Sequence, residues 1–333
     1  MMIKRPLLLA LLALLVACSG NDENRSSTPV DAVAYPRHPI RVIVPFGPGG
    51  LADVTMRLAG EELSKRLGQP LIIENRPGAG GVAATSTMLN AAADGHTLIV
   101  LTNGSAIAQT QFPELPYDII KDLQPISAVA WFDLVLLTSK NSGMTTLQDL
   151  LDKAATGQDL RIATINPGST QHLSAELFKR SAGVEATIIT YRTTPDVLGA
   201  LMRNEVDLVI DAYTALKGAI DGGEALPLAV TGKVRNVALP DVPTAAEAGV
   251  LNYEVEGWNA LYTHQGVAPE IVALLNTALL EVTALPTLQA RFTELGVEAR
   301  ANTATAMQER LLADITKWHQ VMLDAGLAPE GSN

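Results

Sequence analysis

The groups in this sequence most suited to chemistry are the backbone amides of glycine-rich turns. Pro45–Gly50 and Asn75–Gly81 each follow a short β-branched run, Thr102–Ser105 follows a third, and Asn166–Thr170 precedes a helical segment. Glycine permits positive φ and lets a ligand approach the backbone. The exposed N–H groups at a helix start carry a partial positive charge that favours anions. Because several such turns end successive strands, the pattern predicts one cleft that holds a small anion.

Two enzyme-like patterns compete with this interpretation. Neither Gly47–Gly50 nor Gly78–Gly81 fits the phosphate-binding patterns G-x-x-x-x-G-K-[ST] and G-x-G-x-x-G, so phosphoryl transfer has little support. Ser169, His172 and Asp211 leave a hydrolytic triad open, although the sequence has no G-x-S-x-G elbow. His172 is instead expected to cap its helix or contact a ligand. Asp211, at a strand end, is expected to cap the next helix or contact a donor on the ligand.

Composition and charge narrow the function classes further. The 333 residues are 47% apolar, 18% charged and 4% aromatic, which is typical of a folded chain of about two domains. The net charge is −11, and loss of a leader that contains Lys4 and Arg5 would make it −13, so a nucleic-acid partner is excluded. One cysteine excludes an internal disulfide. Neither a metal nor a cofactor is predicted, because the other histidines show no metal-ligand spacing: His38, His96, His264 and His319.

The N-terminus has the features of an export signal. A basic pair precedes Leu7–Val16, an apolar run too short for a membrane span of about 20 residues and suited to a signal peptide. Leu15–Cys18 resembles the bacterial lipobox, in which the cysteine receives the lipid; an ordinary signal peptide is the alternative. The prediction is a lipoprotein signal peptide over residues 1–18, lipidation at Cys18 and a polar tether over residues 19–35. The protein is therefore expected to be periplasmic and anchored to a membrane.

From residue 40 onward, short β-branched runs alternate with segments of helical periodicity. The predicted strands are Ile40–Val44, Leu71–Glu74, Thr97–Leu101, Leu160–Thr164, Ala186–Tyr191, Val206–Asp211 and Leu226–Val230. The predicted helices are Leu51–Leu67, Val82–Ala92, Thr146–Ala155, His172–Ser181 and Asp196–Arg203, followed by a helical tail after Pro269. Such alternation predicts parallel sheets that are covered by helices on both faces.

Three details refine this pattern. Ile126–Thr138 and Tyr253–Thr263 are longer than typical strands and are expected to connect two α/β lobes as hinges. Thr145 and Gln148 form a predicted capping box. Asp53 and Arg57 form a predicted i,i+4 ion pair on the exposed side of their helix.

Several blocks of residues carry a resemblance to a known family. They are Tyr35-Pro36-x-x-Pro39-Ile40-Arg41-x-Ile43-Val44-Pro45-Phe46, Pro48-Gly49-Gly50-x-x-Asp53, Glu74-Asn75-Arg76-Pro77-Gly78-Ala79-Gly80-Gly81, Asp94-Gly95, Tyr117-Asp118-x-x-Lys121-Asp122 and Pro240-Asp241-Val242-Pro243-Thr244-x-x-Glu247-Ala248-Gly249. In these blocks, from Tyr35 to Pro329, the chain resembles the extracytoplasmic solute receptors of the tripartite tricarboxylate transporters, the Bug receptor family.

The resemblance implies an α/β protein with a type II periplasmic-binding fold, in which two lobes enclose a ligand cleft. Lobe 1 is expected to comprise residues 36–133 and 260–333, and lobe 2 residues 134–259. The implied protein is a receptor rather than an enzyme. It would capture a small carboxylate, either a dicarboxylate or an aromatic acid, and deliver it to the large and small membrane subunits of a transporter. A sensor that presents its ligand to a membrane signalling protein is the alternative.

The resemblance also implies which residues line the cleft. A first turn, Pro48–Asp53, and a second turn, Asn166–His172, would hold a carboxylate largely through backbone groups. A β-branched side chain at Gly49 or Gly50 would have to adopt positive φ and would block the ligand. The predicted ligand-binding residues are Phe46, Gly49, Gly50, Leu51, Ala52, Asp53, Gly80, Asn103, Ser169, Thr170, His172, Tyr191 and Asp211. Leu51 and Ala52 stand where the family often has hydroxylated residues, so the rest of the ligand is expected to be partly apolar.

Overall fold

The computed structural model describes residues 35–77, 81–112 and 114–328, and the structural unit discussed below begins at Pro36. Cys18, residues 19–34 of the tether and Gly80 lie outside the described residues. The first part of the unit is a three-stranded parallel sheet in the order β2-β1-β3, in which each strand is followed by a helix. These elements are β1 (Ile40–Val44), α1 (Leu51–Leu67), β2 (Leu71–Asn75), α2 (Val82–Leu89), β3 (Thr97–Thr102) and α3 (Asn103–Gln111).

Local sequence explains most of these boundaries. β1 is a strand of four β-branched residues and Arg41 that is almost entirely buried, as its pattern predicted. α1 has the predicted bounds. Its C-cap is Gly68, whose φ of +70° lies in the left-handed region that this type of helix end requires. α2 ends at Leu89, three residues before the predicted Ala92. α3 was not predicted; it begins at a capping box that Thr102 forms with Ser105.

The second part of the unit repeats the βα pattern around β5, β6 and β7, which are parallel in the order β7-β5-β6. β8 pairs with β4 in antiparallel orientation. The elements are α4 (Leu147–Ala155), β5 (Leu160–Ile165), α5 (Thr170–Ala182), β6 (Ala186–Tyr191), α6 (Thr194–Met202), β7 (Leu208–Ala212), α7 (Tyr213–Asp221) and β8 (Ala225–Val230).

The capping box of α4 is displaced by one residue from the prediction. Thr146, not Thr145, is the N-cap, and its hydroxyl accepts the N–H of Asp149 at 3.1 Å. The Asp149 carboxylate accepts the N–H groups of Thr145 and Thr146 at 2.8 and 2.9 Å, and these bonds lower its pKa to about 2. Gln148 instead donates to Asp152. A carboxylate at this position accepts from both N–H groups, which explains the shift.

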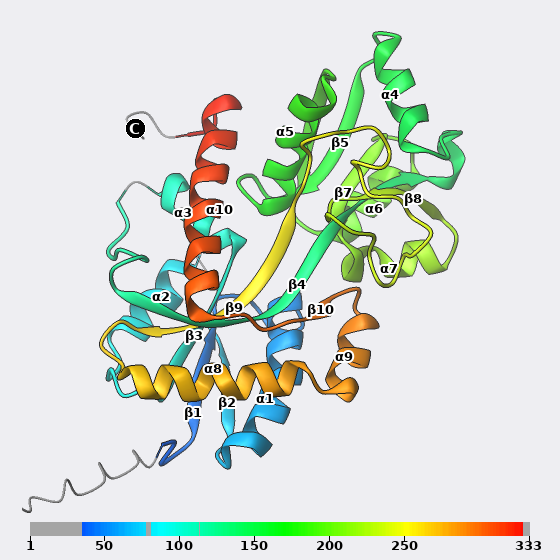
Figure 1. Cartoon of the computed structure of the whole chain (residues 1–333). Coiled ribbons are helices and arrows are strands. Elements are labelled where there is room, and N and C mark those ends of the chain that lie inside the picture. Colours follow the sequence, from blue (N-terminus) through cyan, green and yellow to red (C-terminus); the bar gives the residue numbers. More distant parts are fainter. Residues whose placement is uncertain (1–34, 78–80, 113, 329–333) are drawn as a thin grey trace, which may run out of the picture. The chain divides into compact units, whose positions relative to one another are not determined.

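Two antiparallel strands run between these two parts (Figure 1). β4 (Leu123–Ser139) pairs with β9 (Glu256–His264) along residues 123–133 and then with β7 and β8 along residues 134–139. β9 also pairs with β3. The long runs predicted from the sequence are therefore strands that pass from one set of parallel strands to the other.

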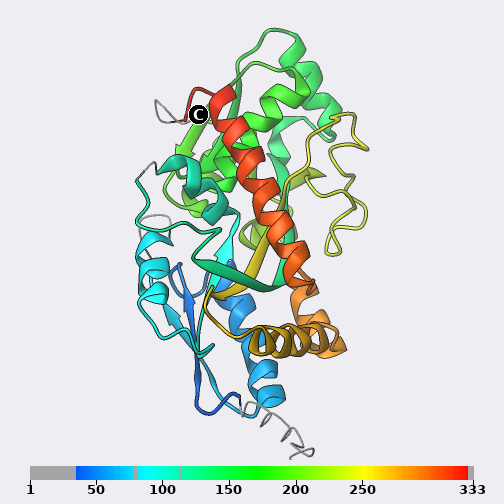
Figure 2. The same ribbon diagram turned by 60° about the vertical axis from the view of Figure 1, so that its left-hand side comes forward.

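The C-terminal segment is mainly helical, with α8 (Pro269–Thr283), α9 (Pro286–Thr293), the short β10 (Glu298–Ala299) and α10 (Ala304–Asp324). α8 packs against α1 and β4, whereas α10 crosses β4 and packs on α3 and α5 (Figures 1 and 2). Within the described residues, no single helix is long and apolar enough to cross a membrane. The α8–α9 pair, bent by 71°, passes that test only when both helices are taken together.

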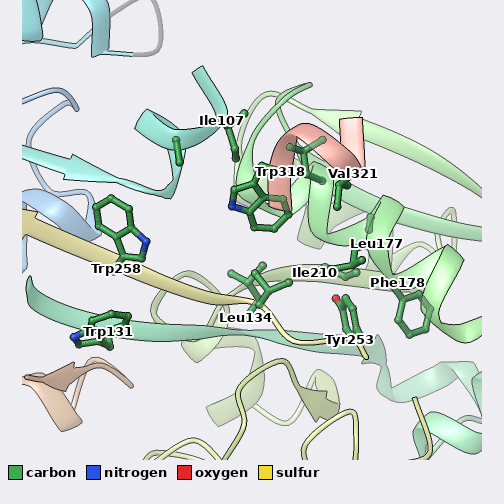
Figure 3. Packing of buried hydrophobic residues seen from close by; sticks show 14 of the residues in the cluster. Ile107, Trp131, Leu134, Leu177, Phe178, Ile210, Tyr253, Trp258, Trp318 and Val321 are labelled. Atoms are coloured by element: carbon green, nitrogen blue, oxygen red, sulfur yellow. The ribbon is translucent and has the colours of Figure 1, made fainter. Parts of the chain in front are cut away.

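One hydrophobic core joins the two parts. Trp131 and Trp258 are paired across β4 and β9, and Trp318 of α10 lies farther along the same core (Figure 3). Phe178 of α5 and Tyr253 continue it, with ring centroids 5.3 Å apart. β4, β9 and α10 therefore share one core, and this core supports the turns at the strand ends.

Candidate functional site

The first predicted turn connects β1 to α1. Gly49 has a φ of +84°, but Gly50 is extended, with φ −72°, so only Gly49 needs the left-handed region. The expectation of positive φ at Gly50 was wrong. Gly50 is the N-cap of α1 and provides no side-chain cap. The N–H groups of Leu51 and Ala52 have no hydrogen-bond partner within the described residues, so this helix start presents unpaired donors.

The carboxylate of Asp53 supports this turn through hydrogen bonds. It accepts from the N–H of Gly49 at 2.9 Å, from Asn75 Nδ2 at 2.8 Å and from Arg57 Nε at 3.0 Å. Asn75 Nδ2 also donates to the carbonyl of Phe46 at 3.0 Å. Only 2% of Asp53 is exposed, so the prediction of an ion pair on the exposed side of α1 was wrong for the acid. Burial raises the pKa of Asp53, but these hydrogen bonds outweigh it and the net pKa is lowered.

The second predicted turn connects β5 to α5. Ser169 is the N-cap: its Oγ accepts the N–H of His172 at 3.1 Å and donates to the carbonyl of Ile165 at 2.6 Å. The N–H groups of Thr170 and Gln171 have no hydrogen-bond partner in the described chain. α5 therefore begins with unpaired donors, as α1 does.

His172 is part of this turn rather than a reactive group. The N–H of Gly168 donates to His172 Nδ1 at 3.2 Å, which places the proton of the neutral ring on Nε2. Burial lowers the pKa of His172, so the neutral form is favoured. Among the described residues, Ser169 Oγ bonds to backbone groups alone, so it has no hydrogen bond through which to pass a proton to this ring.

Asp211, the third residue of the candidate triad, is bonded to groups other than His172. The carboxylate lies at the end of β7 and accepts from Gln171 Nε2 at 2.9 Å, Thr194 Oγ1 at 2.7 Å and its neighbour's N–H at 2.8 Å. It is 3% exposed, and burial raises its pKa. Asp211 thus joins the starts of α5 and α6 and has no hydrogen bond to His172. These side chains do not form a hydrolytic relay.

Asn103 is buried and joins two elements through its side-chain amide. Its Oδ1 accepts the backbone N–H of Trp258 at 2.8 Å, and its Nδ2 donates to the carbonyl of Glu256 at 3.2 Å. It therefore attaches the start of α3 to the crossing strand β9. At the other end of α3, Gln111 lies against Gly168, and its amide occupies the space that a Cβ at Gly168 would fill. α3 is thus a contact between the two parts of the unit at the second turn.

The predicted site residues gather in two places. Phe46, which is 42% exposed, lies with Gly49–Asp53 at the carboxyl ends of β1 and β2. Tyr191, which is half-buried, lies with Ser169–His172 and Asp211 at the carboxyl ends of β5, β6 and β7. Sequence reasoning missed the side chains that bond to the two buried acids. Arg57 and Asn75 donate to Asp53, and Gln171 and Thr194 donate to Asp211. Asn75 begins the Asn75–Gly81 segment and Gln171 lies in the Asn166–His172 turn, and these positions were their only signal in the sequence.

Comparisons with known proteins agree on one family. The family model described as "Tripartite tricarboxylate transporter family receptor" matches residues 55–327. Protein BugT of Bordetella pertussis is 32% identical over 323 residues, which cover 96% of this chain and 97% of that protein.

Solved structures are similar over most of the chain. Rpa4515 of R. palustris, solved with adipate, is 34% identical with a TM-score of 0.77 over 89% of this chain and 99% of that one. MatC of Rhodopseudomonas palustris, solved with bound malate, is 32% identical with a TM-score of 0.72 over 86% and 99%. The periplasmic binding protein BugD is 26% identical with a TM-score of 0.73 over 88% and 99%. The chain has this mixed α/β periplasmic-binding-protein fold.

Proposed function

Because the chain belongs to the tripartite tricarboxylate transporter receptor family, we propose that it captures a small dicarboxylate outside the cytoplasm and delivers it to a transporter of that type. The observation that carries the substrate class is the likeness to two receptors solved with dicarboxylates, adipate and malate. A receptor of this family binds its solute and performs no chemistry on it.

In this proposal, each carboxylate is held by the start of a helix. The N–H groups of Leu51 and Ala52 hold one, and those of Thr170 and Gln171 hold the other. Unpaired donors at a helix start favour a negative group, and such charge-assisted bonds are stronger than neutral ones. A chain of net charge −11 needs such local positive ends to attract an anion.

The supporting side chains keep these donors in place. Asp53 holds the first turn through the Gly49 N–H and Asn75 and is paired with Arg57, whereas Asp211 holds the second turn through Gln171 and Thr194. Gly80 and Tyr191 would lie along the rest of the cleft. We place lobe 1 at residues 36–133 and 260–333 and lobe 2 at residues 134–259. Closure about β4 and β9 would bury the ligand and let a transporter distinguish the loaded receptor from the empty one.

Anchoring is the second element of the proposal. Lipidation at Cys18 and a tether over residues 19–35 would hold the receptor at a membrane in the periplasm, close to the large and small membrane subunits. In cells, Cys18→Ala should block lipidation and leave an unprocessed precursor. Normal maturation of that variant to a free form would contradict the anchor.

The experiment that tests the function is a thermal-shift screen of the purified protein with mono-, di- and aromatic carboxylates. A ligand at 100 times its dissociation constant stabilises the folded state by about 2.7 kcal/mol, which gives a clear shift. Adipate or malate should give a larger shift than matched monocarboxylates. A response confined to aromatic acids would replace the proposed substrate class, and no response to any carboxylate would contradict the function.

A further inference from the structure

Three potential metal ligands meet at the edge of the first sheet opposite the candidate ligand turns. His38 precedes β1, and Asp94 and His96 precede β3; one ligand atom from each lies within 4.8 Å of the others. β1 and β3 are parallel, so these residues lie at the amino ends of strands whose carboxyl ends lead to the ligand turns and α3. A five-residue strand separates the two edges by about 16 Å.

We infer that His38, Asp94 and His96 form a surface site for a zinc-class transition-metal ion. Two imidazoles and one carboxylate are a typical ligand set for Zn²⁺, with water completing the coordination. His96 Nδ1 and Asp94 Oδ1 are 3.5 Å apart. Two ligands at zinc bond lengths of about 2.0–2.2 Å in a tetrahedron are separated by nearly this distance.

Hydrogen bonds to the backbone orient two of the ligands. Asp94 Oδ1 accepts the N–H of His96 at 2.9 Å, which fixes the carboxylate beside the ring. His38 Nδ1 lies 3.2 Å from the carbonyl of Pro39 and donates to it, which leaves the lone pair of Nε2 for a metal. The carbonyl of His96 accepts the N–H of Arg41, so the His96 backbone is held against β1.

Metal binding requires local changes at both histidines. The rings of His38 and His96 are stacked, with centroids 3.8 Å apart and planes 28° apart. Because a metal lies in the plane of an imidazole that binds it, the exposed His38 must turn out of this stack. The N–H of Arg37 donates to His96 Nε2 at 3.2 Å, so the His96 proton must move from Nδ1 to Nε2 and this long bond must open. His38 is exposed, and the His96 side chain, which is 10% exposed, changes the position of its proton without moving its ring.

The site has a structural consequence for the start of the folded chain. His38 lies three residues after Tyr35, whereas Asp94 and His96 belong to the loop before β3. A metal shared by these residues would attach the N-terminal segment to that loop. Zn²⁺ should therefore stabilise the folded protein, because it binds the folded state in preference to the unfolded chain.

Isothermal titration of untagged protein with Zn²⁺, in the absence of any carboxylate, tests the inference independently of the proposed function. We expect one Zn²⁺ per chain, a binding constant weakened at least about tenfold by His38→Ala or Asp94→Asn, and no binding of Mg²⁺. His319→Ala, which removes a distant histidine in α10, is the matched control and should bind Zn²⁺ as the wild type does. His38 and Asp94 are exposed, so their variants should remain folded. The inference is overturned if the wild type binds no Zn²⁺ or if His38→Ala binds it as tightly as the wild type.

Discussion

Asn103 and Trp258 are joined across 155 residues of sequence by a buried hydrogen bond of 2.8 Å from the Trp258 N–H to the Asn103 Oδ1. The same asparagine donates to the carbonyl of Glu256, which also accepts Arg310 Nη2 at 2.6 Å. One point on β9 is therefore held both by the start of α3 and by α10. Glu256 and Trp258 lie where β9 passes between the two parts of the unit. The same contacts therefore hold the start of α3 and the strand β9 in place.

The first prediction concerns Asn103. Asn103→Ala leaves the buried N–H of Trp258 unpaired, which should lower the free energy of unfolding by about 1–3 kcal/mol. Urea denaturation measures this change. Asn90→Ala, at an exposed position after α2, is the matched control and should change stability by less than about 0.5 kcal/mol. Equal effects of the two substitutions would show that the bond to Trp258 does not stabilise the fold.

The second prediction compares two arginines that contact Glu256. Arg310 pairs with Glu256 and Asp314 and is largely buried, whereas the side chain of Arg300 is 46% exposed. Arg310→Met should cost about 3–5 kcal/mol because it leaves the buried Asp314 without its ion-pair partner, although Glu256 keeps Arg300. Arg300→Met should cost about 1 kcal/mol or less. Chemical denaturation of both variants decides the order, and a larger loss for Arg300→Met would contradict the described burial.

The third prediction concerns pH. Burial raises the pKa of Asp133 from 3.8 to about 6, and its neighbour Glu256 acts in the same direction. The folded state therefore binds this proton more tightly than the unfolded chain. Its contribution is fully present below about pH 4 and is lost as the pH rises through about 6.

Asp133→Asn removes this titration. The free energy of unfolding of the variant relative to the wild type should therefore rise by up to about 3 kcal/mol between pH 4 and pH 7 and then remain constant. Denaturation curves for both proteins across this range measure the difference. A difference that does not change with pH would contradict the raised pKa.

The fourth prediction uses adjacent glycines as a matched pair. Gly49→Ala forces a side chain into a φ of +84° and should cost about 1–2 kcal/mol. Gly50→Ala should cost less, because its φ is −72° and a Cβ there would meet only the carbonyl of Gly47, at 3.7 Å. Thermal denaturation of the two variants tests the turn geometry. A greater loss for Gly50→Ala would contradict it.

The fold could be predicted from the sequence where a segment carries its own signal. Ile40–Val44 is β-branched except for Arg41, and Leu51–Leu67 combines an apolar stripe with Gly68 as its C-cap, so both were confirmed. α3 was not predicted because Asn103–Gln111 contains glycine and several polar residues and has no strong apolar stripe. The capping box at Thr102 and the contacts of α3 with α10, α5, β3 and β9 determine that helix.

The site could be predicted only in part. Glycine spacing identified the two turns, but not the direction in which side chains point. Asp53 is buried because its carboxylate accepts hydrogen bonds from the Gly49 N–H and from Asn75. No local sequence pattern indicates these two bonds. His38 and His96 are 58 residues apart, so their stacking follows from the pairing of β1 with β3 and not from spacing.

The central claim is that two helix starts hold the two charged carboxylates of one ligand. Isothermal titration of the wild-type protein with adipate, its monoamide and its diamide tests this directly. The diamide has nearly the same shape and no charge. We expect adipate to bind and the diamide to bind at least about 100-fold more weakly, a difference of about 2.7 kcal/mol, with the monoamide in between. Equal affinities for adipate and its diamide would contradict it.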